Sequence, residues 1–250
     1  ITLAKLGLKP ALLSAIGRDA AGDDLIAACQ RLGLLTQNVY RSDDLPTDIY
    51  MAIEAGQGLI AAIADAHSLE AAGDKILRPL RDGTLGSAQA PWSGMIALDG
   101  NLTVGLLAQI ATSPLFESAD LRIAPASPGK AERLLPLLGH PGATLYVNVE
   151  EAGLILGHDF DDAAQAASAL VARGANRAVV THGPKAAAKA DNDGCVLALP
   201  PAVLASRVTG AGDTFLAAHI AAELRGAGAL QALQAASNAA AAYVSGKSEG

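Results

Sequence analysis

The chain has 250 residues, of which 51% are hydrophobic and only 3% aromatic, and its formal net charge is −7. This length can bury the core of one α/β domain, alone or with a small appendage, and the negative charge excludes a general nucleic-acid binder, which needs a basic face. No apolar run approaches the ~18 residues of a membrane span, so we expect no membrane partner.

The two cysteines, Cys29 and Cys195, lie far apart and lack the spacing of a metal site. We interpret them as buried thiols of a reducing compartment and, since no signal peptide is visible, we expect a cytoplasmic protein. The five histidines form no cluster, and we interpret them as loop or helix-surface residues. The chain begins at Ile1 within an apolar segment, so we expect a native start that precedes it.

The first part of the chain predicts a strand, a helix and a hairpin. The apolar run at 11–16 is expected to be a strand, and the apolar spacing over 25–32 predicts a helix that Gly33 ends. Residues 48–54 alternate in character, a turn follows at 55–58, and an apolar run continues to residue 64. That pattern predicts a β-hairpin.

Helices and strands alternate over the rest of the chain. Expected helices cover 69–80, 103–111, 130–138, 163–173, 212–225 and 230–244. Expected strands cover 95–98, 121–123, 144–147 and 178–181, and residues 191–194 mark a tight hairpin. Alternating βα units predict an α/β fold whose mostly parallel sheet is covered by helices on both faces.

The segment 208–213 leads from an extended stretch through a Gly-rich turn into a helix. Because glycines allow a sharp turn, we expect the amides of Gly210, Ala211 and Gly212 at a helix N-terminus, where they bind phosphate. Asp213 can take a proton from an attacking hydroxyl in a phosphoryl transfer, which needs positioning more than a strong base. The alternative is an ordinary helix entrance with an acidic first turn.

Two other strand ends carry polar residues. Asn148 and Glu151 open a helix, where they can hold a hydrated Mg²⁺ near phosphates, although a helix-capping arrangement is the alternative. Thr181, Gly183 and Lys185 follow a strand in the crevice where open α/β sheets bind ligands, and the alternative is an ordinary turn.

These motifs together resemble the ribokinase-like (PfkB) carbohydrate kinase family. The chain carries N-x-x-E at 148–151, T-x-G-P-K at 181–185 and V-T-G-A-G-D at 208–213, and 14–23 looks like the family's G-x-D-x-x-G stretch. Within the family, the D-x-N-L at 99–102 and the P-x-S-x-x-K that ends at Lys130 look most like pseudouridine kinases. The likeness covers essentially the whole chain.

The resemblance implies a kinase that uses ATP and Mg²⁺ to phosphorylate a primary hydroxyl of a sugar or nucleoside, with pseudouridine as the favoured substrate. A ribokinase- or fructokinase-like sugar kinase and a catalytically weak relative that binds a nucleoside or metabolite are the alternatives. The resemblance implies that Asp213 is the base and that Gly210, Ala211 and Gly212 form the anion hole. It places Asn148 and Glu151 on the Mg²⁺–phosphate side. Thr181, Gly183 and Lys185 would border the nucleotide, and Asn238 would lie near the adenine.

The same likeness implies a main domain of residues 1–47 and 66–250, without its first strand, and a hairpin lid at 48–65 that often makes homodimer contacts in the family. The chain departs from the family at Arg207 and Val208, where many members have Asp-Thr, and this speaks against a bound monovalent cation. It also has Ala124 in place of an Asp and Ala186 in place of a glycine.

Two residues indicate which substrate receives the phosphoryl group. Asp99 and Asn101 follow a strand, and their carboxylate and amide offer acceptors and donors to a uracil edge or to ribose hydroxyls. The alternative is that Asn101 caps the next helix. In the lid, alternating Ile49, Met51 and Ile53 predict an apolar face that covers a flat base.

Overall fold

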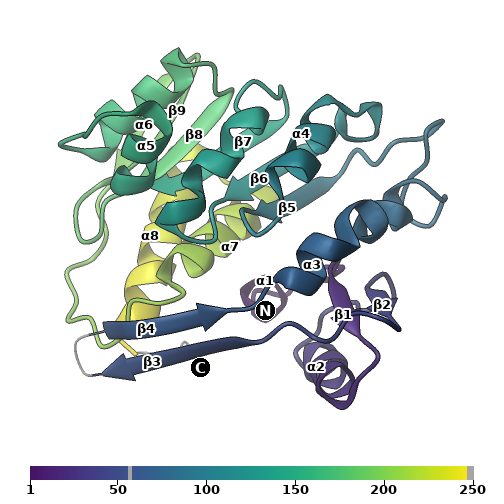
Figure 1. Ribbon diagram of the computed structural model, residues 1–250. Helices are drawn as coiled ribbons and strands as arrows, with labels where there is room; N and C mark the ends of the chain where they lie inside the picture. The colour runs from purple at the N-terminus through teal and green to yellow at the C-terminus, as the bar shows by residue number, and fades with distance from the viewer. Residues whose placement is uncertain (56–57, 247–250) are drawn as a thin grey trace.

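The computed structural model describes residues 1–55 and 58–246 and is built around one six-stranded sheet, in the order β10-β9-β8-β7-β6-β5 (Figure 1). Strands β5 to β8 run parallel, and β9 and β10 extend one edge in antiparallel pairing. The strands are β5 (Met95–Asp99), β6 (Asp120–Ala124), β7 (Ala143–Asn148), β8 (Arg177–Thr181), β9 (Ala187–Asp191) and β10 (Gly194–Ala198). The predicted α/β class with a mostly parallel sheet is confirmed.

Helices cover both faces of this sheet, so its strands are buried on both sides. In β7, Leu145 and Val147 belong to one core and Tyr146 to the other, as the alternation of a strand requires. The first core packs under α4 (Val104–Thr112), the 3₁₀ helix η3 (Pro128–Leu137), α5 (Val149–Leu156) and α6 (Ala163–Ala172). The second packs under α7 (Ala211–Leu224) and α8 (Ala229–Val244).

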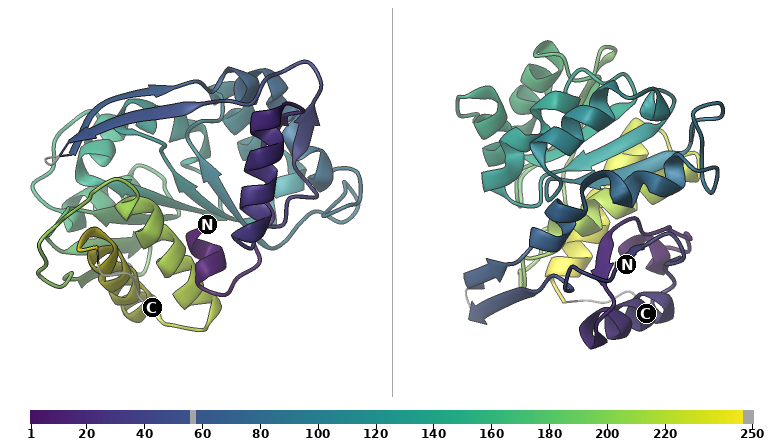
Figure 2. Two further views of the ribbon diagram at one scale, coloured as in Figure 1. Left: turned by 90° about the horizontal axis from the view of Figure 1, so that it is seen from below. Right: turned by 45° about the vertical axis from the view of Figure 1, so that its right-hand side comes forward.

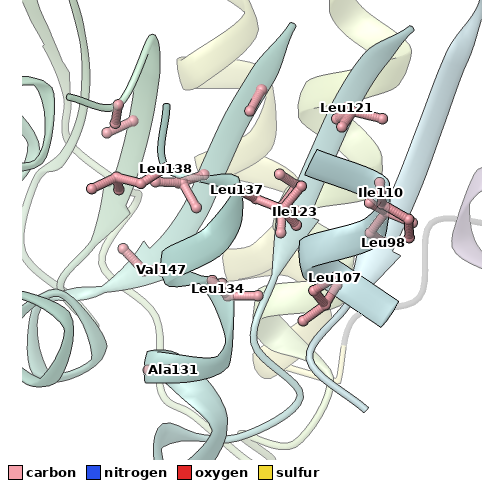
Figure 3. Packing of buried hydrophobic residues seen from close by; sticks show 14 of the residues in the cluster. Leu98, Leu107, Ile110, Leu121, Ile123, Ala131, Leu134, Leu137, Leu138 and Val147 are labelled. Atoms are coloured by element: carbon pink, nitrogen blue, oxygen red, sulfur yellow. The ribbon is translucent and has the colours of Figure 1, made fainter. Parts of the chain in front are cut away.

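Figure 3 shows the first core from close by, where aliphatic side chains of the strands meet those of α4 and η3. Leu121 and Ile123 of β6 are completely buried, as are Leu107 and Ile110 of α4. Burying such a side chain stabilises the fold by about 1.5–3 kcal/mol, so this core fixes the strand ends that carry the polar residues of the motifs.

The N-terminal part forms a smaller arrangement beside the sheet (Figure 2). Its strands β1 (Ala15–Gly17) and β2 (Tyr40–Ser42) pair in parallel, and β3 (Tyr50–Ala55) and β4 (Gly58–Ala64) form an antiparallel hairpin. The predicted hairpin is therefore present, while Gly56 and Gln57 of its predicted turn lie outside the described residues. The remaining helices are α1 (Thr2–Lys5), α2 (Ala20–Arg31), α3 (His67–Ala72), η1 (Gly73–Leu80) and η2 (Pro114–Phe116).

Three predicted elements differ from the structure for identifiable reasons. The predicted strand at 11–16 is reduced to β1, because its partner β2 offers only three residues to pair with. The predicted helix at 69–80 changes to 3₁₀ after Ala72, where Gly73 adopts φ 55°. The predicted helix at 130–138 is also 3₁₀ and contains Pro136, which lacks the N–H of an α-helical bond.

The expectations for cysteine and histidine were partly wrong. Cys29 is buried, but Cys195 is exposed, because it lies on β10 at the edge of the sheet. His140 and His219 are buried rather than on the surface. Among the described residues, no helix combines the length and the apolar character that crossing a membrane requires.

Candidate active site

A cleft of about 1000 Å³ opens where the carboxyl ends of β5, β6, β7 and β8 meet the start of α7 and the base of the β3–β4 hairpin. This is the edge at which open α/β sheets bind ligands. Eight predicted site residues line it: Asp99, Asn101, Asn148, Glu151, Thr181, Gly210, Gly212 and Asp213. The other four, Ala211, Gly183, Lys185 and Asn238, are not among its lining residues.

The Gly-rich turn enters α7 at Gly210, which adopts φ 89° and ψ 0°, a left-handed conformation that favours glycine. The N–H of Ala211 donates to the carbonyl of Val208 at 3.0 Å, so this amide closes the turn and is not available to an anion. The hydrogen bonds of the described residues leave the N–H groups of Gly210, Gly212 and Asp213 without an acceptor. Such N–H groups at a helix start attract negative charge.

Asp213 lies in the first turn of α7 and is exposed. Its side chain takes part in no salt bridge or hydrogen bond within the part of the chain that the structure describes, and it borders the cleft beside Gly210 and Gly212. A free carboxylate next to unoccupied amides can accept a proton from a hydroxyl while the amides hold an anion.

Asn148 and Glu151 form the reciprocal capping arrangement that was the alternative interpretation of this pair. The N–H of Glu151 donates to Asn148 Oδ1 and the N–H of Asn148 donates to Glu151 Oε2, both at 2.8 Å. Both residues also line the cleft. Burial raises the pKa of the Glu151 carboxyl.

The donor set of this pair fits a hydrated Mg²⁺. Glu151 has a second carboxylate oxygen for which the described residues provide no hydrogen-bond donor. Mg²⁺ keeps several waters and needs one or two carboxylates rather than a full cage. Among residues 1–55 and 58–246, no group of three or more His, Cys, Asp or Glu side chains is arranged to hold a metal.

A second polar group of the cleft lies at the end of β5. The N–H of Asn101 donates to Asp99 Oδ1 at 2.8 Å, its Nδ2 donates to Asp99 Oδ2 at 3.3 Å, and its Oδ1 accepts from Lys130 Nζ at 2.5 Å. The helix-capping alternative for Asn101 is wrong, because Thr103 caps α4 by accepting from the N–H of Leu106. Sequence reasoning gave Lys130 no role; its place in the P-x-S-x-x-K motif was the available signal.

The other predicted nucleotide contacts lie outside the cleft. Asn238 is exposed on α8, where its Oδ1 accepts from Gln234 Nε2 at 2.9 Å. Lys185 is exposed in the turn after β8, and Gly183 of the same turn adopts φ 53°. Only Thr181, the last residue of β8, borders the cleft directly.

Only part of the predicted apolar face of the hairpin lies at the cleft. Ile49 and Tyr50 line the cleft, whereas Met51 and Ile53 do not. Successive strand residues point to opposite faces, so the face with Met51 and Ile53 turns away from Tyr50. Met51 pairs with Ile63 across the hairpin. The side chains of Met51, Ile53 and Ile63 are 58%, 56% and 70% exposed.

The base of the hairpin is fixed by carboxylates. Asp48 accepts from the N–H groups of Ser68 and Leu69 at 2.9 and 3.0 Å, which joins the start of β3 to α3. Asp19 accepts from both the hydroxyl and the N–H of Thr47, at 2.6 and 2.8 Å. Since Thr47 and Asp48 line the cleft, these bonds set the position from which the hairpin leaves the domain.

A buried polar layer lies beneath the cleft, between the sheet and α7. Tyr146 lines the cleft, and its hydroxyl pairs with His219 Nδ1 and accepts from Arg122, both at 2.9 Å. Glu223 bonds Arg122 and accepts from Lys189 at 2.7 Å. Burial lowers the pKa of His219 to about 4 and raises that of Tyr146 to about 12. The ion pairs of Glu223 with Arg122 and Lys189 and the hydrogen bond between His219 and Tyr146 fasten α7, which carries Asp213, to β6, β9 and β7.

Comparison with known proteins gives a family and a set of structural neighbours. A family model described as pfkB family carbohydrate kinase matches residues 1–250. The structure is similar to a carbohydrate kinase from Agrobacterium tumefaciens, with a TM-score of 0.79 and 25% identity over 96% of this chain and 75% of that one. No curated protein sequence matches the chain.

Two more distant neighbours share the fold. One is an adenosine kinase from Schistosoma mansoni in complex with 2-fluoroadenosine, with a TM-score of 0.76 and 18% identity over 97% of this chain and 77% of that one. The other is a putative ribokinase II from E. coli in complex with ATP and Mg²⁺, with a TM-score of 0.70 and 18% identity over 98% of this chain and 79% of that one.

Proposed function

The chain belongs to the pfkB family of carbohydrate kinases, which transfer a phosphoryl group to an alcohol, and we propose that it moves the γ-phosphate of ATP to a primary hydroxyl of a nucleoside, with pseudouridine as the favoured acceptor. The observation that carries this proposal is that one cleft contains Asp213 and the amides of Gly210 and Gly212 together with the Asp99–Asn101–Lys130 group.

In this proposal, Asp213 accepts the proton of the acceptor hydroxyl while its oxygen attacks the γ-phosphorus. The N–H groups of Gly210 and Gly212 stabilise the charge on the transferred phosphoryl group, which is spread over its oxygens in a loose transition state. Asn148 and Glu151 would hold a hydrated Mg²⁺, and such an ion would neutralise phosphate charge. Thr181, Gly183, Lys185 and Asn238 border the nucleotide, with Asn238 on the adenine side.

The preference for a nucleoside is supported by the polar group at the end of β5. Asp99 offers acceptors, and Lys130 has N–H donors beyond the one that it gives to Asn101. The base of pseudouridine presents both N–H donors and carbonyl acceptors, so it can pair with the two side chains at once. Tyr50 also lines the cleft, and its ring can supply a flat apolar surface for the same base.

The proposal includes the hairpin at 48–65 as a lid and as the contact of a homodimer. Its exposed Met51, Ile53 and Ile63 lie on the face away from Tyr50, and a contiguous exposed apolar surface of this kind is typical of an interface. Light scattering of the eluting protein, with Ile63→Lys as the disrupting variant, measures whether the mass is that of a dimer. We also propose a cytoplasmic location, which the unpaired Cys29 and Cys195 support.

The identity of the phosphoryl acceptor is tested by measuring kcat/KM for pseudouridine, uridine, ribose and fructose with ATP and Mg²⁺. The proposal predicts the highest value for pseudouridine, because polar groups built for a base are left unpaired by a free sugar. In Asp99→Asn, the value for pseudouridine should fall more than that for ribose. Equal or better values for ribose or fructose in the unmodified protein would leave a general sugar kinase, and no turnover of any acceptor would leave a binding protein.

A further inference from the structure

The last turn of α8 lies against the segment that leads to Asp213. The hydroxyl of Tyr243 donates to the carbonyl of Thr209 at 2.9 Å. A Cβ atom on Gly210 would lie 2.6 Å from the same hydroxyl, closer than real side chains approach one another. The Tyr243 hydroxyl therefore occupies the space that any larger residue at 210 would need, and the turn packs directly against this hydroxyl.

Arg207 joins the two segments a second time. Its guanidinium carbon lies 3.8 Å from the centre of the Tyr243 ring, and its Nε donates to the Tyr243 carbonyl at 2.9 Å. The neighbouring Ser206 donates to the carbonyl of Val244 from its N–H at 2.7 Å and from its hydroxyl at 3.1 Å. Residues 206–209 are thus bonded to α8 at both ends.

Other contacts hold this stretch weakly. Val208 is 69% exposed and Leu204 is 93% exposed, so the approach to the turn is not held by a core. The local bond from Ala211 to Val208 shapes the turn but does not fix its place on the domain. The N–H of Thr214 donates to the Gly210 carbonyl at 3.0 Å and joins the turn to α7, and the contacts with Tyr243 and Val244 fix residues 206–209 against α8.

We propose that Tyr243 is a positioning residue for phosphoryl transfer, which acts by holding the Gly210 turn so that its amides face the cleft. It is not among the residues that line the cleft, so it acts through Thr209 and Gly210. The inference rests on the proposed function for its catalytic consequence. The amides act on charge that develops in the transition state, so a displaced turn lowers kcat more than it weakens substrate binding.

The test compares Tyr243→Phe, which removes the hydroxyl and keeps the ring under Arg207, with Tyr40→Phe. Tyr40 is a matched control because its ring also lies near a cation, with Lys75 Nζ 5.4 Å from its centre, and it does not line the cleft. Tyr243→Phe should lower kcat about three- to tenfold, the loss of one net hydrogen bond, and leave KM for ATP within about twofold. Tyr40→Phe should change neither. An unchanged kcat in Tyr243→Phe would overturn the proposal.

A second readout does not depend on activity. Amide hydrogen exchange of the peptide that covers 206–214 should be faster in Tyr243→Phe than in the unmodified protein and in Tyr40→Phe, with the melting temperature kept. Unchanged exchange would show that the hydroxyl does not hold the turn, and this result would overturn the inference. If the unmodified protein phosphorylates no acceptor, the proposed function fails, and the exchange measurement still decides whether Tyr243 holds the turn.

Discussion

Lys130 donates a hydrogen bond of 2.5 Å to the side-chain oxygen of Asn101 and contributes the only cationic side chain to the described lining of the cleft. The acidic residues of that lining are Asp48, Asp65, Asp99, Glu151 and Asp213. In the proposed function this ammonium group binds the acceptor together with Asp99, so its removal should lower catalytic efficiency.

Replacement of Lys130 by Met keeps the length of the side chain and removes its charge. We expect kcat/KM to fall by about tenfold or more, because a hydrogen bond to a charged group is worth about 1.5–3 kcal/mol. Lys75→Met, outside the cleft, is the control, and both variants are measured by ADP release. A Lys130→Met enzyme as efficient as the Lys75→Met enzyme would show that the ammonium group has no role in the site.

The hydrogen bonds to the Asp19 carboxylate should make the stability of the fold sensitive to acid. The Thr47 hydroxyl, the Thr47 N–H and the Gly22 N–H donate to its carboxylate and lower its pKa from 3.8 to about 2. Since the folded-state pKa is the lower one, the stabilisation is complete above the unfolded value and is lost as pH falls through 3.8 towards 2. In Asp19→Asn, the free energy of unfolding should be lower at pH 7 and depend less on pH in this window. Asp24→Asn is the control, and an identical pH profile for Asp19→Asn would contradict this account.

His219 should make the free energy of unfolding decrease with falling pH in a higher pH range than Asp19 does. Burial lowers its pKa from 6.5 to about 4, the Lys189 and Arg122 charges add to this, Glu223 opposes it, and the Tyr146 hydroxyl contacts its ring. Between these pKa values the unfolded state binds the extra proton, so stability is complete above pH 6.5 and declines towards pH 4. Urea unfolding at a series of pH values should show this slope, and His219→Asn should remove it. The prediction is wrong if the unmodified protein is equally stable at pH 7 and pH 4.5.

The position of Arg207 predicts that activity does not require K⁺. Its guanidinium lies on the Tyr243 ring next to the Gly210 turn, and a metal cation beside another positive charge is disfavoured. Initial rates in K⁺, Na⁺ and tetramethylammonium salts at one ionic strength should agree. Strong activation by K⁺ alone would contradict the prediction.

The fold and the placement of most predicted site residues around the cleft follow from local patterns in the sequence. The alternating βα units and the strand ends at Asp99, Asn148 and Thr181 are set by periodicity and short motifs, so they could be predicted and are found in the structure. Helix type was less predictable, because Pro136 and the φ of 55° at Gly73 convert regular apolar spacing into 3₁₀ turns.

The contacts that depend on distant segments could not be predicted. Tyr243 is separated from Thr209 by 34 residues, and His219 from Tyr146 by 73. In an Ala-rich helix, nothing local distinguishes a buried His from an exposed one. The lid face was predicted only in part for the same reason, since alternation defines two faces of a strand but not how far either of them meets the cleft, and only Ile49 of the predicted face lines it.

The most direct test of the central claim is the turnover of Asp213→Asn. We expect phosphoryl transfer to fall by about 10²–10⁴, the usual cost of losing a general base, while the melting temperature stays unchanged because Asp213 is exposed and forms no side-chain hydrogen bond or ion pair within the described residues. Asp193→Asn, in the exposed turn between β9 and β10, is the matched control. A folded Asp213→Asn enzyme with near-normal turnover would contradict the assignment of Asp213 as the base and with it the mechanism proposed for this cleft.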